Sequence, residues 1–211
     1  MSARNTAELL LAVLVFPASA AAQPTELMKR IWAGVQQAQQ KYNSACGTIT
    51  ETRTSQLLAK PMVFHGKFCA DGMTRFALEY TDPDPIRIRY NQDYLNVTTG
   101  GGKRTEVIEV GGNVRRTQSF FSKENSLDNL QKSFTIDVRE SDGLFEMKLT
   151  PRSERFRSRV NYLVVKLAKD DFLLRSLEVD GKSGVNSVFT IAITSFNAAI
   201  APGTFEVIKP K

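Results

Sequence analysis

The chain has 211 residues, of which 42% are hydrophobic and 24% are charged, and its formal net charge is +6. The length allows one domain with a sizeable core. We expect no nucleic-acid partner, because the sequence has no dense basic helix and no base-stacking motif. The small positive excess favours anionic surfaces such as phospholipid head groups, although ordinary solubility explains it equally well.

The N-terminus has the pattern of a secretory signal. Arg4 precedes the apolar run 9–16, and Pro17 and the small residues 18–22 follow it. The run is too short to span a bilayer, and the small residues suit cleavage after Ala20 or Ala22. We therefore predict a signal peptide over residues 1–22 and an exported, soluble, single domain over residues 23–211.

An amphipathic helix is predicted next. Thr25 is a candidate N-cap, and Glu26 suits the positive end of the helix dipole. Apolar residues then recur at spacings of three and four, namely Leu27, Ile31, Val35, Ala38 and Tyr42. Such a stripe is typical of a helix of about five turns with one buried face.

From Gly47 onward the apolar period is two, which predicts β-strands. Clear examples are residues 86–90, 134–138, 145–149, 163–167 and 189–193, and turn signals such as Asp142-Gly143 separate the strands. We expect about nine to eleven strands, too many for one flat sheet, so the sheet should curl or close. Residues 119–133 break the pattern and predict a short helix that covers an opening, with Phe120, Leu127 and Leu130 on one side.

The two cysteines, Cys46 and Cys69, lie in neighbouring predicted strands. A hairpin centred near Leu57 would place them opposite each other, and export would place them in an oxidising compartment. We predict a structural disulfide, with free core thiols as the alternative. Two cysteines and one distant histidine cannot complete a closed zinc site, so we expect no metal.

The residue inventory argues against an enzyme. His65 is the only histidine and lies in a predicted strand, and the sequence has no G-x-S-x-G, H-E-x-x-H or C-x-x-C motif. The stretch GGGKRT lacks the first glycine of a phosphate loop and precedes a strand, so it predicts a hairpin turn. We therefore expect no catalytic residues and no cofactor.

Several short stretches together resemble LolA-type periplasmic lipoprotein carriers. Residues 75–83 match the family segment R-F-x-x-x-Y-x-x-P, and the strand pair that follows occupies the place of a family hairpin. Phe120-Phe121, Leu149-Thr150-Pro151 and the closing stretch Pro202-Gly203-Thr204-Phe205-Glu206-Val207 match as well. One departure concerns an arginine that holds the lid shut in family carriers and lies just before a proline. Residues 70–74 contain neither this arginine nor the proline, so the lid role is not assigned to Arg75.

The resemblance implies a mainly β fold with some α structure: a curved, unclosed antiparallel β-barrel with an N-terminal helix and a short lid helix over an apolar cavity. It also implies a monomer in the periplasm that carries acylated lipoproteins or related lipids. An inner-membrane exporter would deliver this cargo and an outer-membrane acceptor would receive it, with no cofactor. The alternative is a non-enzymatic lipid-sensing or protein-interaction domain of the kind found in the regulator RseB.

Two groups of residues are candidates for this function. The chain is rich in large apolar side chains, with 13 phenylalanines, and those expected to contact lipid are Trp32, Val35, Phe76, Leu78, Tyr80, Ile88, Phe120, Phe121, Leu127 and Leu130. Core packing predicts the same alternation for each of them, so both interpretations stay open. The second group, Arg152, Arg155, Arg157 and Arg159, lies in a predicted loop and is either a docking patch for an acidic partner or a membrane, or a solvated loop.

Overall fold

The computed structural model describes residues 25–72, 74–109 and 126–209. The predicted signal peptide over residues 1–22 lies outside these ranges, as do Phe120 and Phe121. Within the described ranges, no helix is long and apolar enough to cross a membrane.

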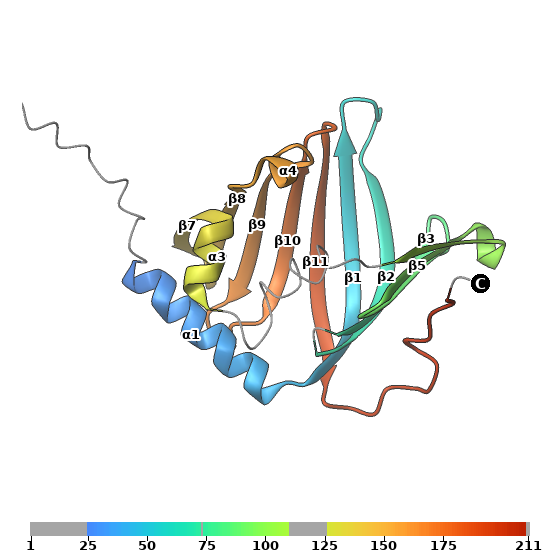
Figure 1. Ribbon diagram of the computed structural model, residues 1–211, viewed down its shortest axis with the longest axis horizontal. Coiled ribbons are helices and arrows are strands. Elements are labelled where there is room, and N and C mark those ends of the chain that lie inside the picture. Colours follow the sequence, from blue (N-terminus) through green and yellow to red (C-terminus); the bar gives the residue numbers. More distant parts are fainter. Residues whose placement is uncertain (1–24, 73, 110–125, 210–211) are drawn as a thin grey trace, which may run out of the picture.

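The described strands form one eleven-stranded antiparallel sheet that bends strongly along its length (Figure 1). The strand order is β6-β5-β4-β3-β2-β1-β11-β10-β9-β8-β7, so the described strands β6 and β7 are the two edges and the sheet does not close. The strands are β1 (Ser44–Ser55), β2 (Met62–Asp71), β3 (Arg75–Asp82), β4 (Ile86–Asn91), β5 (Tyr94–Thr99), β6 (Arg104–Glu109), β7 (Phe134–Ser141), β8 (Leu144–Pro151), β9 (Val160–Ala168), β10 (Leu174–Gly181) and β11 (Val185–Phe196). The predicted curved, unclosed antiparallel fold is confirmed.

Four helical elements accompany the sheet in the described part of the chain. They are α1 (Glu26–Lys41), the 3-10 turn η1 (Gly100–Gly102), α3 (Leu127–Ser133) and α4 (Glu154–Arg157). The side chain of Thr25 caps α1 by accepting a hydrogen bond from the Met28 amide at 3.2 Å, so the predicted start of this helix is confirmed. The stretch GGGKRT forms the turn between β5 and β6, as the sequence predicts, and its last two residues begin β6. The loop expected around Arg155 contains α4, one turn of helix that the sequence analysis did not foresee.

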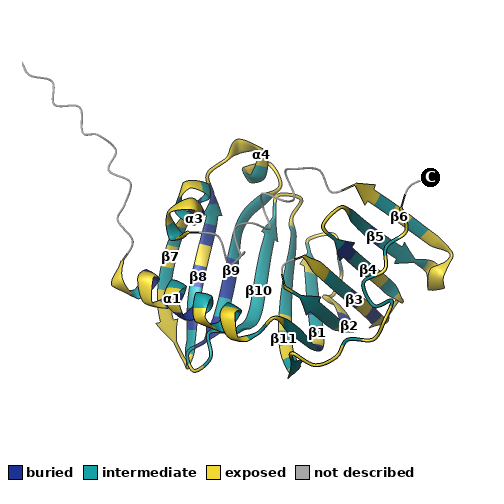
Figure 2. Cartoon of the chain, turned by 60° about the horizontal axis from the view of Figure 1, so that its bottom comes forward, coloured by how far each residue is buried: buried dark blue, intermediate teal, exposed yellow. Residues whose placement is uncertain are grey.

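Helices α1 and α3 pack together on the β7–β9 part of the sheet, on the side that we call the inner face (Figure 2). Ile31 of α1, Leu130 of α3 and Leu149 of β8 are all almost completely buried in one cluster. Phe134, Phe145, Met147, Val165 and Leu167 complete this first cluster. The helices therefore fill this part of the face with side chains.

A disulfide joins the first two strands of the sheet. Cys46 of β1 pairs directly with Cys69 of β2, and the distance between the two sulfur atoms is 2.08 Å. The β1–β2 hairpin turns between Ser55 and Met62, around the position that the sequence analysis expected.

We predict that replacing both Cys46 and Cys69 with alanine lowers the free energy of unfolding by about 3 kcal/mol, because the crosslink closes a loop of moderate length in the unfolded chain. Denaturant unfolding of the oxidised protein and of the double variant measures this difference. Reduced wild-type protein serves as the control and should unfold like the variant. Equal stability of oxidised and reduced wild-type protein would contradict the prediction.

Candidate functional site

One row of paired residues crosses the sheet on its inner face. Directly paired residues of neighbouring strands point to the same side, so the ladder identifies which side chains share a face. From β8 to β2 the row consists of Met147, Val165, Leu177, Phe189, Glu51 and Phe64. Five of these six side chains are apolar. The inner face is therefore continuous from the helix-covered part to the other half of the sheet.

A second apolar cluster occupies that other half. Its buried members are Ile49, Phe64, Leu78 and Tyr80, and it lies on strands β1 to β3. The side chains packed around it are only partly buried, namely Phe68, Phe76, Ile86, Ile88, Phe189 and Ile191. These six leave part of their apolar surface accessible, and an apolar ligand could cover it.

Four of the predicted lipid-contacting residues meet in this second cluster. Leu78 of β3 pairs with Phe68 on one side and with Ile88 on the other, and Phe76 and Tyr80 follow on the same face of β3. Alternation along β3 places Phe76, Leu78 and Tyr80 inward. The structure thus brings Phe76, Leu78, Tyr80 and Ile88 together as one surface.

The other predicted residues lie elsewhere. Leu130 belongs to the first cluster, and Trp32 and Val35 pack against it. Leu127 begins α3 and is half-buried, whereas Phe120 and Phe121 lie outside the described residues. Helix side chains that were expected over an open cavity therefore contribute to core packing in the part of the chain that the structure describes.

The inner face also carries a buried carboxylate. Glu51 is 3% exposed and occupies the middle of the apolar row. Its Oε1 accepts hydrogen bonds from Nε and Nη2 of Arg53, at 3.0 and 2.8 Å, and from the Ser187 hydroxyl at 2.9 Å. Its Oε2 accepts a hydrogen bond from the Tyr80 hydroxyl at 2.7 Å. Four donor groups on three residues thus surround one carboxylate.

This network determines the protonation state of Tyr80. Burial raises the pKa of the Tyr80 hydroxyl well above its ordinary value of 10.0, and the hydrogen bond to Glu51 and the charge of that carboxylate raise it further. The nearby guanidinium of Arg53 acts in the opposite direction with a smaller effect. Tyr80 therefore stays a neutral hydrogen-bond donor at physiological pH.

Arg53 forms the border between the second cluster and solvent. Its side chain is 40% exposed, and its guanidinium carbon lies 4.8 Å from the centre of the Phe64 ring. The ion pair with Glu51 fixes one edge of the guanidinium, and the ring supports its flat face. The inner face thus combines an apolar surface with one oriented polar group at its margin.

Glu51 and Arg53 are not among the residues predicted from the sequence. A signal was present, because alternation from Ile49 places Glu51 and Arg53 on the same side of β1 as an apolar residue. Pattern alone could not show that this side was buried, nor that Tyr80 and Ser187 would supply hydrogen bonds from distant strands.

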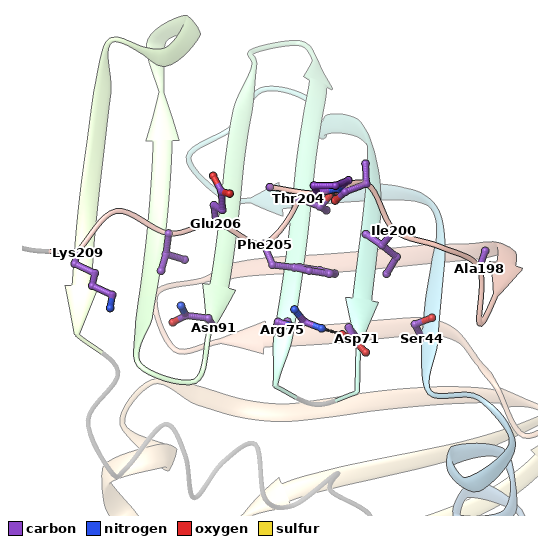
Figure 3. Close-up of a pocket in the computed structure, with 14 residues that line it drawn as sticks. Ser44, Asp71, Arg75, Asn91, Ala198, Ile200, Thr204, Phe205, Glu206 and Lys209 are labelled. Carbon is purple, nitrogen blue, oxygen red and sulfur yellow. Dashed lines mark hydrogen bonds and ion pairs between the residues drawn. The ribbon is translucent and has the colours of Figure 1, made fainter.

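The outer face of the same half is crossed by the C-terminal segment, residues 198–209 (Figure 3). This segment and residues of β1 to β4 enclose a pocket of about 640 Å³. The guanidinium of Arg75 lies 5.2 Å from the centre of the Phe205 ring and also pairs with Asp71. Two stretches that carry the LolA resemblance, 75–83 and 202–207, therefore contact each other here.

Asn96 holds the end of this segment. Its side chain is buried on β5, where its amide nitrogen donates to the Ile208 carbonyl at 3.1 Å and its oxygen accepts from the Ile208 amide. Arg89 of β4 adds a weaker bond to the Glu206 carbonyl at 3.4 Å. Because Arg75 and Phe76 are neighbours in one strand, the matched motif serves both faces: its arginine contacts the C-terminal segment and its phenylalanine contacts the second cluster.

The remaining candidate residues lie away from the inner face. His65 is exposed on the outer side of β2, with its Nδ1 atom 3.3 Å from the Thr50 hydroxyl. No group of three or more potential metal ligands occurs among the described residues. Arg152, Arg155, Arg157 and Arg159 are exposed in and around α4.

No protein-family model and no curated protein matches the sequence. Solved structures do match. An uncharacterised conserved protein from Thermus thermophilus aligns with 85% of this chain and 97% of its own, at 9% identity and a TM-score of 0.50. A LolA-superfamily protein from Nitrosomonas europaea aligns with 85% of this chain and 97% of its own, at 10% identity and a TM-score of 0.44. The Pseudomonas aeruginosa MucA/MucB complex aligns with 84% of this chain and spans 60% of the matched chain, at 9% identity and a TM-score of 0.49.

At these identities the similarity concerns the fold alone. The chain is similar in fold to the Thermus protein, and its own architecture, a mainly antiparallel, curved and unclosed sheet with few helices, is the one expected from the sequence.

We predict that Tyr80→Phe lowers the free energy of unfolding by about 2 kcal/mol at neutral pH, because a buried carboxylate loses a hydrogen bond. The raised pKa of Tyr80 adds a pH dependence. The Tyr80 hydroxyl ionises above about pH 10 in the unfolded chain but not in the folded chain. The difference in unfolding free energy between the wild type and Tyr80→Phe therefore falls by about 1.4 kcal/mol per pH unit above that value. Denaturant unfolding between pH 7 and about 11 measures both effects.

Tyr162→Phe is the matched control for this prediction, because that hydroxyl bonds Glu178 on the outer face at 3.3 Å and is only half-buried. Tyr162→Phe should lower the free energy of unfolding by less than Tyr80→Phe at neutral pH. Equal decreases for the two variants would show that the hydrogen bond to buried Glu51 stabilises the fold no more than an outer-face bond does.

We predict that Asn96→Ala releases the C-terminal segment from the outer face, because both side-chain bonds to Ile208 are lost. Hydrogen exchange should show faster exchange of the amides of residues 205–209, equivalent to about 1–3 kcal/mol of lost protection. Thr98→Val on the same strand removes a bond to Thr105 within the sheet and should leave these amides protected. Unchanged exchange in Asn96→Ala would contradict the assignment.

Proposed function

We propose that this protein is a non-enzymatic periplasmic carrier that binds the acyl chains of lipoproteins or related lipids on its inner face. It would take this cargo at the inner membrane and release it towards the outer membrane. The observation that supports the proposal is the second cluster, where six partly buried apolar side chains surround a buried apolar centre on an unclosed sheet. Four of the residues in and around that cluster are those that the sequence analysis selected from the LolA resemblance and from alternation.

The physical chemistry of the cargo suits such a surface. Each methylene removed from water contributes about 0.8 kcal/mol, so leaving a chain of about sixteen carbons in water costs on the order of 12 kcal/mol. A carrier must replace that water with apolar contacts and still release the chain. Aromatic and aliphatic side chains such as Phe68, Phe76 and Ile88 give contacts without a fixed direction, so the cargo can slide and exchange.

The decisive experiment is native mass spectrometry of the mature protein purified from a periplasmic extract, followed by lipid extraction. We expect a co-purifying acylated species, or uptake of an added triacylated lipopeptide by the empty protein. An apo mass that takes up no acyl ligand would overturn the proposal and favour a protein-interaction domain.

We predict that Ile88→Lys reduces acyl uptake at least about tenfold, because a charged amine in the apolar surface must lose its hydration when the chain binds. The matched control is Val188→Lys. Val188 is also half-buried in a strand, but it pairs with Thr52 and Glu178 on the outer face. Uptake that falls equally in both variants would show that the inner face is not the binding surface.

A further inference from the structure

Three turns lie next to one another at one end of the sheet (Figure 1). They are residues 56–61 between β1 and β2, residues 152–159 between β8 and β9, and residues 182–184 between β10 and β11. The Lys182 amide donates to the Arg159 carbonyl at 2.9 Å, which joins the second and third turns. Ser55 pairs with Val185, which places the first turn beside the third.

These turns concentrate positive charge. Among the described residues of the three turns, six exposed cations stand against one carboxylate, that of Glu154. We call these six residues the basic end: Lys60, Arg152, Arg155, Arg157, Arg159 and Lys182. Their arrangement at a single end allows one flat surface to meet several of them together.

The arginines of the basic end differ from most of the other described arginines. Six arginines elsewhere form ion pairs with carboxylates, namely Arg30, Arg53, Arg75, Arg87, Arg139 and Arg175. No ion pair within the described residues involves the four arginines of the β8–β9 turn. Their charges are thus available to an external anion.

The fold presents these charges on a supported element. Phe156 of α4 packs edge-on against the Phe134 ring, with the ring centres 5.6 Å apart. The Ser153 carbonyl accepts hydrogen bonds from the amides of Phe156 and Arg157, at 3.1 and 2.9 Å. The anchored phenylalanine fixes the turn, and its neighbours Arg155 and Arg157 are directed to solvent.

Exposed apolar side chains accompany the charges. Leu57, in the β1–β2 turn, is 93% exposed, and Met62 and Val63 at the start of β2 are 36% and 39% exposed. Asp82 ends β3 and Asp84 lies in the β3–β4 turn, so neither carboxylate belongs to the three turns of the basic end. Cations beside an isolated exposed leucine fit a lipid surface, which offers both phosphates and an apolar layer.

We propose that the basic end docks on a membrane surface rich in anionic phospholipids. The arginines and lysines bind phosphate groups, and Leu57 enters the boundary between head groups and acyl chains. Each cation near an anionic bilayer strengthens binding about fivefold, so a few acting together give a stable but reversible contact. Salt weakens this contact because the groups are exposed.

Docking here would place the second cluster beside the membrane. Arg53 pairs with Met62 and Ser187, close to this end, and Glu51 and Phe64 form the next pair on the inner face. An acyl chain that leaves the bilayer at this end would first contact Arg53 and then the apolar surface of the second cluster. Docking itself does not depend on the proposed carrier function.

The test is co-sedimentation of the mature protein with vesicles of phosphatidylcholine, with and without phosphatidylglycerol. We expect binding only to the anionic vesicles, and loss of binding at high salt. Replacing the four arginines with glutamine should weaken binding at least about tenfold, and replacing them with lysine should preserve it. Changing Lys103 and Arg104 to glutamine, two exposed cations outside the basic end, should have little effect.

Three results would overturn the proposal: equal binding to neutral vesicles, unchanged binding of the glutamine variant, or loss of binding in the lysine variant. The last result would indicate an acidic protein partner that recognises arginine geometry instead of charge. Leu57→Asp provides a second variant that touches no core residue and should also weaken vesicle binding. Ile88→Lys changes the inner face and leaves the basic end intact, so it should still bind the anionic vesicles, which distinguishes failure of docking from failure of the carrier proposal.

Discussion

The structure depends on the pairing of β1 with β11. This ladder joins two sequential series of antiparallel strands, β1 to β6 and β7 to β11, into one sheet. It connects the first strand of the chain with the last, so it closes the longest loop in the fold, and none of its register is set by a local turn. The shared inner face exists only because this register aligns Ile49 with Ile191 and Glu51 with Phe189. Without it, the two apolar clusters would belong to separate sheets.

The buried network of Glu51 lies at this same junction. Its carboxylate accepts from Ser187 across the β1–β11 pairing and from Tyr80 of β3, two strands away on the other side. A slip of one residue would turn Glu51 to the outer face, and a slip of two would separate it from Ser187. A buried carboxylate without partners is strongly unfavourable, whereas apolar pairs tolerate such shifts. We infer that this polar group contributes to register at the one pairing that no turn specifies.

Local patterns in the sequence predict the helices and strands well, but they do not predict which elements lie side by side in the fold. The N-cap at Thr25, the period of two and the turn glycines locate the first helix and the strands, because these features depend on nearby residues. Alternation also places Phe76, Leu78 and Tyr80 on one face. Alternation cannot show which strand lies beside β1, so the contact of Glu51 with Ser187 was not predicted. For the same reason Trp32 and Leu130, which belong to the first cluster, were predicted to share a surface with residues of the second. The contact between Arg75 and Phe205 is equally non-local.

The two halves of the inner face differ in a way that suits a binding protein. Helices α1 and α3 bury Ile31 and Leu130 against β7–β9, so that half supplies packed core. The other half keeps side chains such as Phe68 and Ile88 partly accessible, which gives up some of the stability that full burial would provide. One continuous sheet links the halves, so the packed half and the β1–β11 ladder hold the accessible surface in shape. A carrier needs this division, because a surface that packed its own side chains completely would have no apolar area left for a cargo.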